Sequence, residues 1–163
     1  MKQSFNAGVY FKYRAYGFSL LFWLVVISAL LSFSQRVFAA SDYAVFTLKP
    51  SFTELTRSKV RMLYRGKTKS LQGKRVELSD WPESSLERSE FYQYLLGKDV
   101  AQMNAYWASL SFSGKARPPK EIGDASVDAL IHWLQEKPNR IGYAPLDALP
   151  QEAKILYVVS KEK

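Results

Sequence analysis

The chain has 163 residues, no cysteine, a single histidine (His132) and a formal net charge of +8 at pH 7. The lack of cysteine excludes a disulfide framework, and one imidazole leaves no zinc-type ligand set and no Cys–His nucleophile pair. A positive charge favours anionic partners, so its distribution along the chain decides what it means.

The first part of the chain has the pattern of a secretory signal. Two lysines and an arginine precede an apolar run over residues 18–33, and Val37-Phe38-Ala39 fits the small-x-small cleavage rule. We therefore predict a signal peptide over residues 1–39. Because the apolar run is nearly long enough to span a bilayer, an uncleaved inner-membrane anchor is the alternative. Either reading places residues 40–163 outside the cytoplasm, in the periplasm.

Removal of this segment halves the charge. It takes away four of the 23 basic residues and none of the 15 acidic ones, so the net charge falls from +8 to +4. The remaining basic residues are spread over segments such as 67–75 and 115–120. This mild excess favours a small anionic ligand or plain solubility over nucleic acid.

The first elements of the mature chain follow from local patterns. The β-branched and aromatic residues of Tyr43–Leu48 predict a short strand. Capping-box spacing in Ser51–Glu54 predicts a helix that continues past Met62 and ends at Gly66. A basic loop or hairpin turn should follow, leading to a strand over residues 75–78.

The second half alternates helices that have recognisable caps with short strands. We expect helices from about Ser85 to Leu96, from Asp99 onward and from Ser126 to before Pro138, a Gly- and Pro-rich connection over 111–120, and strands at Ile141–Ala144 and Lys154–Val159. Alternating strands and helices predict an α/β domain with a mostly parallel sheet flanked by helices.

Two hydroxyls and a guanidinium gather at one predicted helix start. Ser84 and Ser85 precede Arg88 by one turn. Free amides at a helix N-terminus, the positive end of the helix dipole and an arginine could together bind an oxyanion. The same residues also fit a capping box between Ser84 and Glu87, and the sequence alone leaves both interpretations open.

Several motifs occur together in a characteristic order: Tyr64-Arg65-Gly66-Lys67, Ser84-Ser85-Leu86-Glu87-Arg88 running into Phe91-Tyr92, Leu96-Gly97-Lys98, Phe112-Ser113-Gly114-Lys115 and Ile141-Gly142-Tyr143. This series resembles short exported proteins that are similar to the phosphate-binding protein of bacterial ABC transporters. The resemblance covers nearly all of the mature chain. It implies a periplasmic-binding-protein-like fold of type II over residues 40–163, amounting to about one lobe of the two-lobed clamp.

The resemblance also implies a binding site. The ligand-binding residues would be Ser84, Ser85, Leu86 and Arg88, with Ser85 as the phosphate-contacting serine. The chain departs from the full-length binders at Leu86 and Glu87, where those proteins carry a small residue and a threonine.

The implied function is capture of inorganic phosphate or another small oxyanion for a membrane transporter or sensor, with no cofactor, metal or nucleic acid. We expect no enzyme, because nothing pairs the carboxylates near Glu87 with a nucleophile. The alternative is a periplasmic interaction module that derives from a binding-protein lobe, has lost its ligand and associates with a protein partner or as a homodimer.

Overall fold

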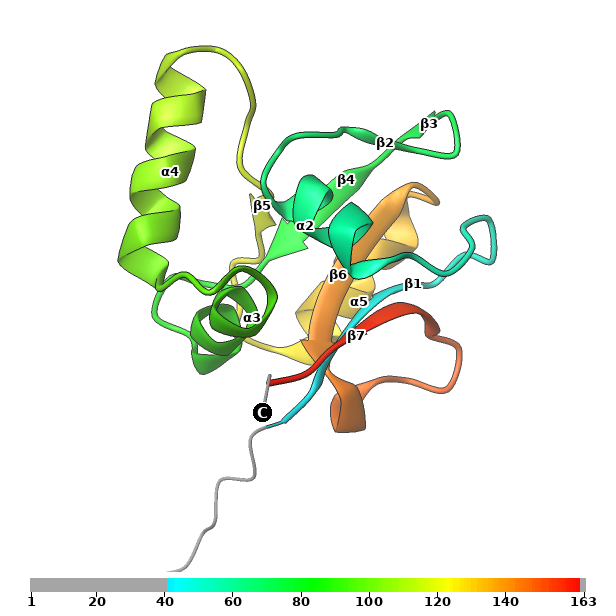
Figure 1. Ribbon diagram of the computed structural model, residues 1–163. Coiled ribbons are helices and arrows are strands. Elements are labelled where there is room, and N and C mark those ends of the chain that lie inside the picture. The colour runs from blue at the N-terminus through cyan, green and yellow to red at the C-terminus, as the bar shows by residue number, and fades with distance from the viewer. Residues whose placement is uncertain (1–40, 162–163) are drawn as a thin grey trace, which may run out of the picture. The chain divides into compact units, whose positions relative to one another are not determined.

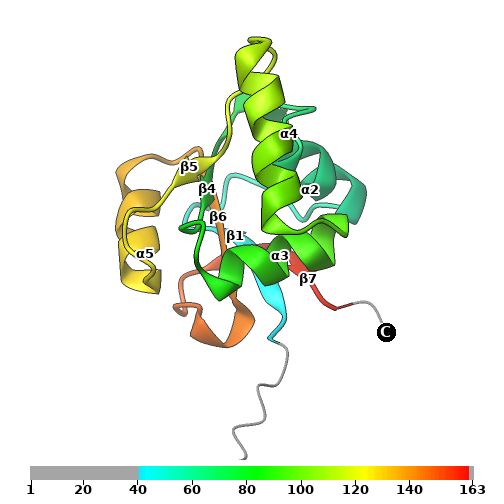
Figure 2. The ribbon, with the colours of Figure 1, turned by 90° about the vertical axis from the view of Figure 1, so that its left-hand side faces the viewer.

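The computed structural model describes residues 41–161, which form a five-stranded sheet with helices on both faces (Figures 1 and 2). The signal predicted over residues 1–39 lies outside the described residues. Within 41–161, no helix is both long and apolar enough to cross a membrane.

Four of the five strands of the sheet run in the same direction. The order is β5-β4-β6-β1-β7; β4 pairs in parallel with β5 and β6, whereas β1 is antiparallel to both β6 and β7. The predicted mostly parallel sheet is therefore confirmed, with β1 as the reversed strand. The strands are β1 (Tyr43–Thr47), β4 (Glu77–Asp80), β5 (Lys120–Glu121), β6 (Arg140–Pro145) and β7 (Lys154–Val159).

The helices divide between the two faces of this sheet. They are α2 (Arg57–Tyr64), α3 (Leu86–Leu96), α4 (Val100–Phe112) and α5 (Val127–Glu136), with a 3₁₀ turn at Leu146–Ala148. Figure 2 shows α5 on one face and α2 and α3 on the other, with α4 beside α3. The chain thus leaves β4 through α3 and α4 on one face and reaches β6 through α5 on the other. In sheets with this arrangement, ligands commonly bind outside the carboxyl ends of the strands from which the chain leaves to opposite faces.

An aromatic cluster fixes α2 and α3 against the sheet. Phe91 of α3 stacks on Tyr143 of β6 with ring centroids 3.5 Å apart, and Tyr64 of α2 meets both rings edge-on. All three side chains are fully buried, as is every residue of β1. Burial of such large rings contributes substantially to the apolar area that holds the layers together.

Local capping signals were the most accurate part of the sequence analysis. The predicted helix starts of α3, α4 and α5 are confirmed, and each cap side chain accepts a hydrogen bond from the amide three residues on: Ser85 from Arg88, Asp99 from Gln102 and Ser126 from Ala129. At α3 the cap is Ser85, so the capping box considered between Ser84 and Glu87 is wrong by one position.

The predicted start of α2 is wrong. The helix begins at Arg57, and its cap is Thr56, whose hydroxyl accepts from the amide of Lys59. The amide of Leu55 instead donates to the carbonyl of Leu156 in β7 at 2.8 Å. This pairing with the sheet keeps the segment before Thr56 out of the helix.

The basic segment after α2 forms a hairpin; the sequence analysis expected either a loop or a hairpin turn there. Strands β2 (Ser70–Leu71) and β3 (Lys74–Arg75) are joined by Gln72 and Gly73, which both have positive φ, as a type I′ turn requires. The strand expected over residues 75–78 is therefore divided, because β3 ends at Arg75 and β4 begins at Glu77.

Gly66 gives the first testable prediction. Its φ is +63°, and a Cβ there would lie 2.9 Å from the Trp107 ring and 3.0 Å from the Ala116 Cβ. Gly97 has nearly the same φ, +66°, but open space around it. We expect Gly97→Ala to cost about 1 kcal/mol of unfolding free energy through its backbone, and Gly66→Ala about 1–3 kcal/mol more through the clash. Urea unfolding of the two variants measures the difference, and equal losses would contradict the close packing around Gly66.

Candidate functional site

A buried carboxylate lies at the carboxyl end of β4. Asp80 is 2% exposed. Its two oxygens accept hydrogen bonds from the hydroxyl of Tyr143 at 2.6 Å, the hydroxyl of Tyr92 at 2.7 Å and the amide of Trp81 at 3.0 Å. These donors come from β6, from α3 and from the segment between β4 and α3, so Asp80 connects all three.

Arg88, in the first turn of α3, points inward to this carboxylate. Its Nε lies 3.5 Å from Asp80 Oδ2, an ion-pair distance without a hydrogen bond. Its terminal nitrogens donate to Glu121 at 3.1 Å, to the Trp81 carbonyl at 3.2 Å and to Asn104 at 2.9 Å. The guanidinium therefore joins β4, β5, α3 and α4.

Burial dominates the electrostatics of this cluster. Burial raises the pKa of Asp80 above its usual range, although the charge of Arg88 and the hydrogen bonds from Tyr143 and Tyr92 partly offset the shift. Burial, together with the charge of Asp80, also raises the pKa values of both tyrosines, so they stay protonated as donors.

The start of α3 is capped but retains hydrogen-bond donors. Ser85 Oγ accepts from the amide of Arg88 at 3.2 Å and uses only its acceptor capacity for this bond. The amides of Leu86 and Glu87 lie in the first turn, where no intrahelical carbonyl is available to them. The side chain of Leu86 is 53% exposed.

The structure thus places the four residues of the predicted ligand site in one turn with different orientations. Ser84 is exposed, Ser85 caps the helix and Leu86 is half-exposed, whereas the guanidinium of Arg88 is held by internal partners. Oxyanion binding at this turn stays a prediction. Sequence reasoning placed Arg88 in the ligand site and did not identify Asp80 as its partner.

Carboxylates surround this helix start. Glu121 pairs with Arg88, and Glu83 accepts from the Asn104 amide at 2.6 Å. Together with Asp80 they outnumber the single guanidinium, so an anion here would depend on amides and hydroxyls more than on net charge. Among residues 41–161, no three His, Cys, Asp or Glu side chains are placed to hold a metal ion.

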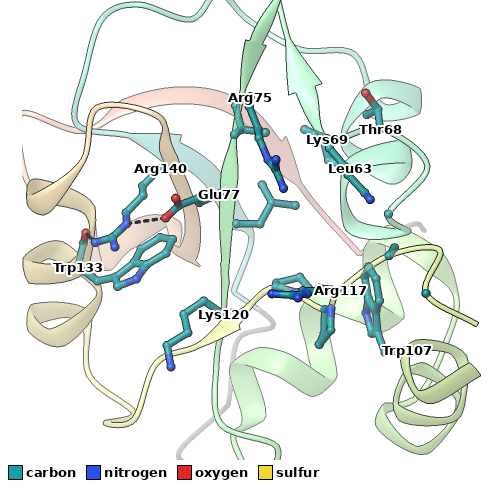
Figure 3. A pocket seen from close by; sticks show the side chains of 17 residues that line it. Leu63, Thr68, Lys69, Arg75, Glu77, Trp107, Arg117, Lys120, Trp133 and Arg140 are labelled. Carbon is teal, nitrogen blue, oxygen red and sulfur yellow. Dashed lines mark hydrogen bonds and ion pairs between the residues drawn. The ribbon is translucent and has the colours of Figure 1, made fainter. Parts of the chain in front are cut away.

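A cleft lies at the amino ends of the same strands. This cleft, of about 770 Å³, is lined by the hairpin β2–β3, by the end of α2, by residues 114–120 and by the first residues of β4 and β6 (Figure 3). Four of its five basic residues come from two segments, 67–75 and 115–120, that the sequence analysis noted separately, and the fifth is Arg140 of β6. Nothing local in the sequence indicated that these two segments face the same space.

Structure comparison relates this fold to phosphate-transport proteins. The chain is similar to an ABC-type phosphate transport receptor from Vibrio cholerae, with 14% identity, a TM-score of 0.53 and coverage of 73% of this chain and 47% of that one. It is also similar to a putative phosphate ABC transporter substrate-binding protein from Clostridium perfringens, solved with bound phosphate, with 15% identity, a TM-score of 0.53 and coverage of 72% and 45%. No sequence-family profile and no curated protein sequence matches the chain.

These comparisons define the fold and its extent. The chain has the fold of a lobe of a phosphate substrate-binding protein, as the sequence motifs implied, and it matches less than half the length of those two proteins. At such low identity the likeness concerns the fold alone.

The buried ion pair yields a prediction for Arg88→Gln. Removing the cation leaves Asp80 buried without a positive partner, so we expect a loss of about 3 kcal/mol in unfolding free energy at pH 7. The variant also raises the folded pKa of Asp80 further above its unfolded value. The buried, ionised carboxylate of Asp80 destabilises the protein above its folded pKa, and this destabilisation is absent below the unfolded pKa of about 3.9. The loss of unfolding free energy in the variant should therefore shrink as the pH falls toward about 4.

Denaturant unfolding of both proteins across this pH range is the measurement. The matched control is Arg117→Gln, which removes an exposed arginine that has no ion pair within 41–161 and should stay within about 0.5 kcal/mol of the unchanged protein. A pH-independent deficit in Arg88→Gln would contradict the coupling to Asp80.

Proposed function

We propose that this chain is an exported, single-lobe binding protein that takes phosphate or another small oxyanion at the N-terminus of α3. The observation that carries the proposal is the place of this helix start, directly after β4 at the carboxyl edge of the sheet. In open α/β sheets, ligands bind in the crevice outside this edge, where the connections leave to opposite faces. The likeness to two phosphate-transport proteins supports phosphate as the first ligand to test.

The local chemistry suits an oxyanion in a specific way. Because Ser85 uses its oxygen to cap the helix, its hydroxyl proton remains available to an anion while the cap stays intact. The amides of Leu86 and Glu87 would add two further donors, together with the helix dipole. Ser84 lies beside them. Arg88 would not contact the anion; its ion pair with Asp80 would hold the turn in place.

Such a site would bind weakly. One lobe encloses one side of a ligand and excludes little water, and the neighbouring Glu83 and Glu121 oppose a second negative charge. The function that fits is reversible capture in the periplasm, with transfer to a membrane transporter or sensor. Export would depend on the signal predicted over residues 1–39, or inner-membrane anchoring if that segment is not cleaved.

The substitution Ser85→Asp separates ligand binding from helix capping. Aspartate caps helices as well as serine does, so stability should stay within about 0.5 kcal/mol. It supplies no donor proton and adds a negative charge, so phosphate binding should be lost. Calorimetric titration with phosphate and sulfate, at low ionic strength and millimolar anion, is the measurement.

Ser85→Asn is the matched control, because asparagine caps the helix without a charge and keeps donor protons. It should retain more binding than Ser85→Asp. The absence of heat with either anion in the unchanged protein would reject the small-ligand function, and equal binding by Ser85→Asp would move the site elsewhere.

A second candidate function is an interaction module, favoured by exposed apolar side chains. Leu86 is 53% exposed at the same helix start, and Phe112 is 98% exposed at the end of α4. A partner or a second copy would cover these side chains, and a contiguous apolar patch is the usual mark of such a surface. If this function holds, light scattering should find a dimer without phosphate that Leu86→Ser dissociates. A monomer at all concentrations would reject self-association.

A further inference from the structure

We propose that the cleft at the amino ends of β4, β5 and β6 is a second anion site, for a small molecule that carries two or more phosphate groups. It lies at the opposite end of β4 from the start of α3, so it does not depend on the site proposed above. Its volume, about 770 Å³, is in the range of small-molecule sites and far exceeds the needs of one phosphate.

The charges in this cleft are strongly unbalanced. Its lining includes five basic side chains and one carboxylate, Glu77. Glu77 is already occupied, because Lys137 donates to it at 2.9 Å and Arg140 at 3.2 Å. These contacts lower the pKa of Glu77, with the Lys137 hydrogen bond as the largest cause, so it stays ionised and paired.

Four cations in the cleft are left without a carboxylate partner within residues 41–161. They are exposed and come from different segments: Lys69 and Arg75 from the hairpin, Arg117 from the α4–β5 connection and Lys120 from β5. Figure 3 shows them around one hollow, with Trp107 and Trp133 on opposite sides. Several separated cations around one space fit an anion with several charged groups.

The walls of the cleft are held in place without a ligand. Lys69 Nζ donates to the Lys115 carbonyl at 3.2 Å, which ties the hairpin to the α4–β5 connection. The side-chain amide of Asn139 donates to the Arg75 carbonyl at 3.0 Å and ties the hairpin to the turn before β6. The cations therefore lie close together before any anion enters, which lowers the entropic cost of binding.

Trp107 supplies an independent observation. Its side chain lines the cleft and is 5% exposed, and its indole nitrogen is buried without a hydrogen-bond partner. Buried N–H groups rarely stay unpaired, because each carries a desolvation cost. Because the Trp107 ring lines the cleft, its indole N–H resonance would report on a ligand that binds there.

The aromatic residues favour a phosphate-based ligand over a nucleotide base. Trp107 is too buried to offer a ring face, and the Arg140 guanidinium lies over the Trp133 ring at 4.3 Å. Stacking of a base would need an open ring face. Arg75 and Arg117 instead offer planar donor forks, which bind phosphate oxygens in pairs.

The test uses tripolyphosphate as the probe, with calorimetry for affinity and the Trp107 indole N–H resonance for location. We expect binding that weakens with added salt, and a shift of that resonance on titration. Arg75→Gln combined with Arg117→Gln should weaken binding by about tenfold or more. The charge-matched control, Lys49→Gln with Lys161→Gln, removes two exposed lysines outside the cleft and should leave the affinity within about twofold.

Two further arms identify the source of the phosphate groups. Sedimentation with vesicles of cardiolipin, whose headgroup carries two phosphates, that depends on the same two arginines would assign the site to lipid headgroups, whereas tripolyphosphate binding alone would assign it to a free ligand. Binding of neither probe, or equal binding by the cleft and control variants, would overturn the proposal. Binding of oligoglutamate alone would also overturn it, in favour of an acidic protein segment. Ser85→Asp should not change tripolyphosphate affinity, which keeps the two sites distinguishable.

Discussion

The contact between Asp80 and Arg88 is the constraint on which the carboxyl edge of this sheet depends. Two opposite charges, 3.5 Å apart and almost fully buried, each cost several kcal/mol to remove from water, and only a complete set of partners offsets that cost. The partners come from every neighbouring element: Tyr143 from β6, Tyr92 from α3, Asn104 from α4 and Glu121 from β5. A shift of any one element would therefore leave a buried charge unpaired.

This constraint also determines what the start of α3 can do. With Arg88 turned inward, the surface of the turn presents the hydroxyls of Ser84 and Ser85, two amides and the side chain of Leu86. Amide donors at a fixed distance from the sheet would preorganise the proposed oxyanion site, and the surrounding carboxylates would limit its affinity. The same rigidity would present Leu86 to a protein partner in one orientation, so both candidate functions depend on the same buried pair.

The limits of sequence reasoning follow from the range of the interactions. The caps at Ser85, Asp99 and Ser126 act within three residues, so local patterns identified them. The start of α2 was missed because Leu55 pairs with Leu156, about a hundred positions away in the chain. The basic cleft was missed for the same reason, because its cations come from distant segments that only the fold brings together. Asp80 lies only eight residues before Arg88, and it was missed because no local pattern shows that the connection between β4 and α3 turns the two side chains toward each other.

The two ends of β4 differ in how they compensate charge, and this difference predicts different ligands. At the carboxyl end, every buried charge has partners, so an anion would meet short-range donors whose strength changes little with salt. At the amino end, Arg75, Arg117, Lys69 and Lys120 are exposed without carboxylate partners within residues 41–161, and their attraction for an anion extends over about 10 Å at an ionic strength of about 0.1 M. The first arrangement selects by fit to one small oxyanion. The second selects by total charge, so a single phosphate would gain little there and a chain of phosphates would gain at each cation it reaches.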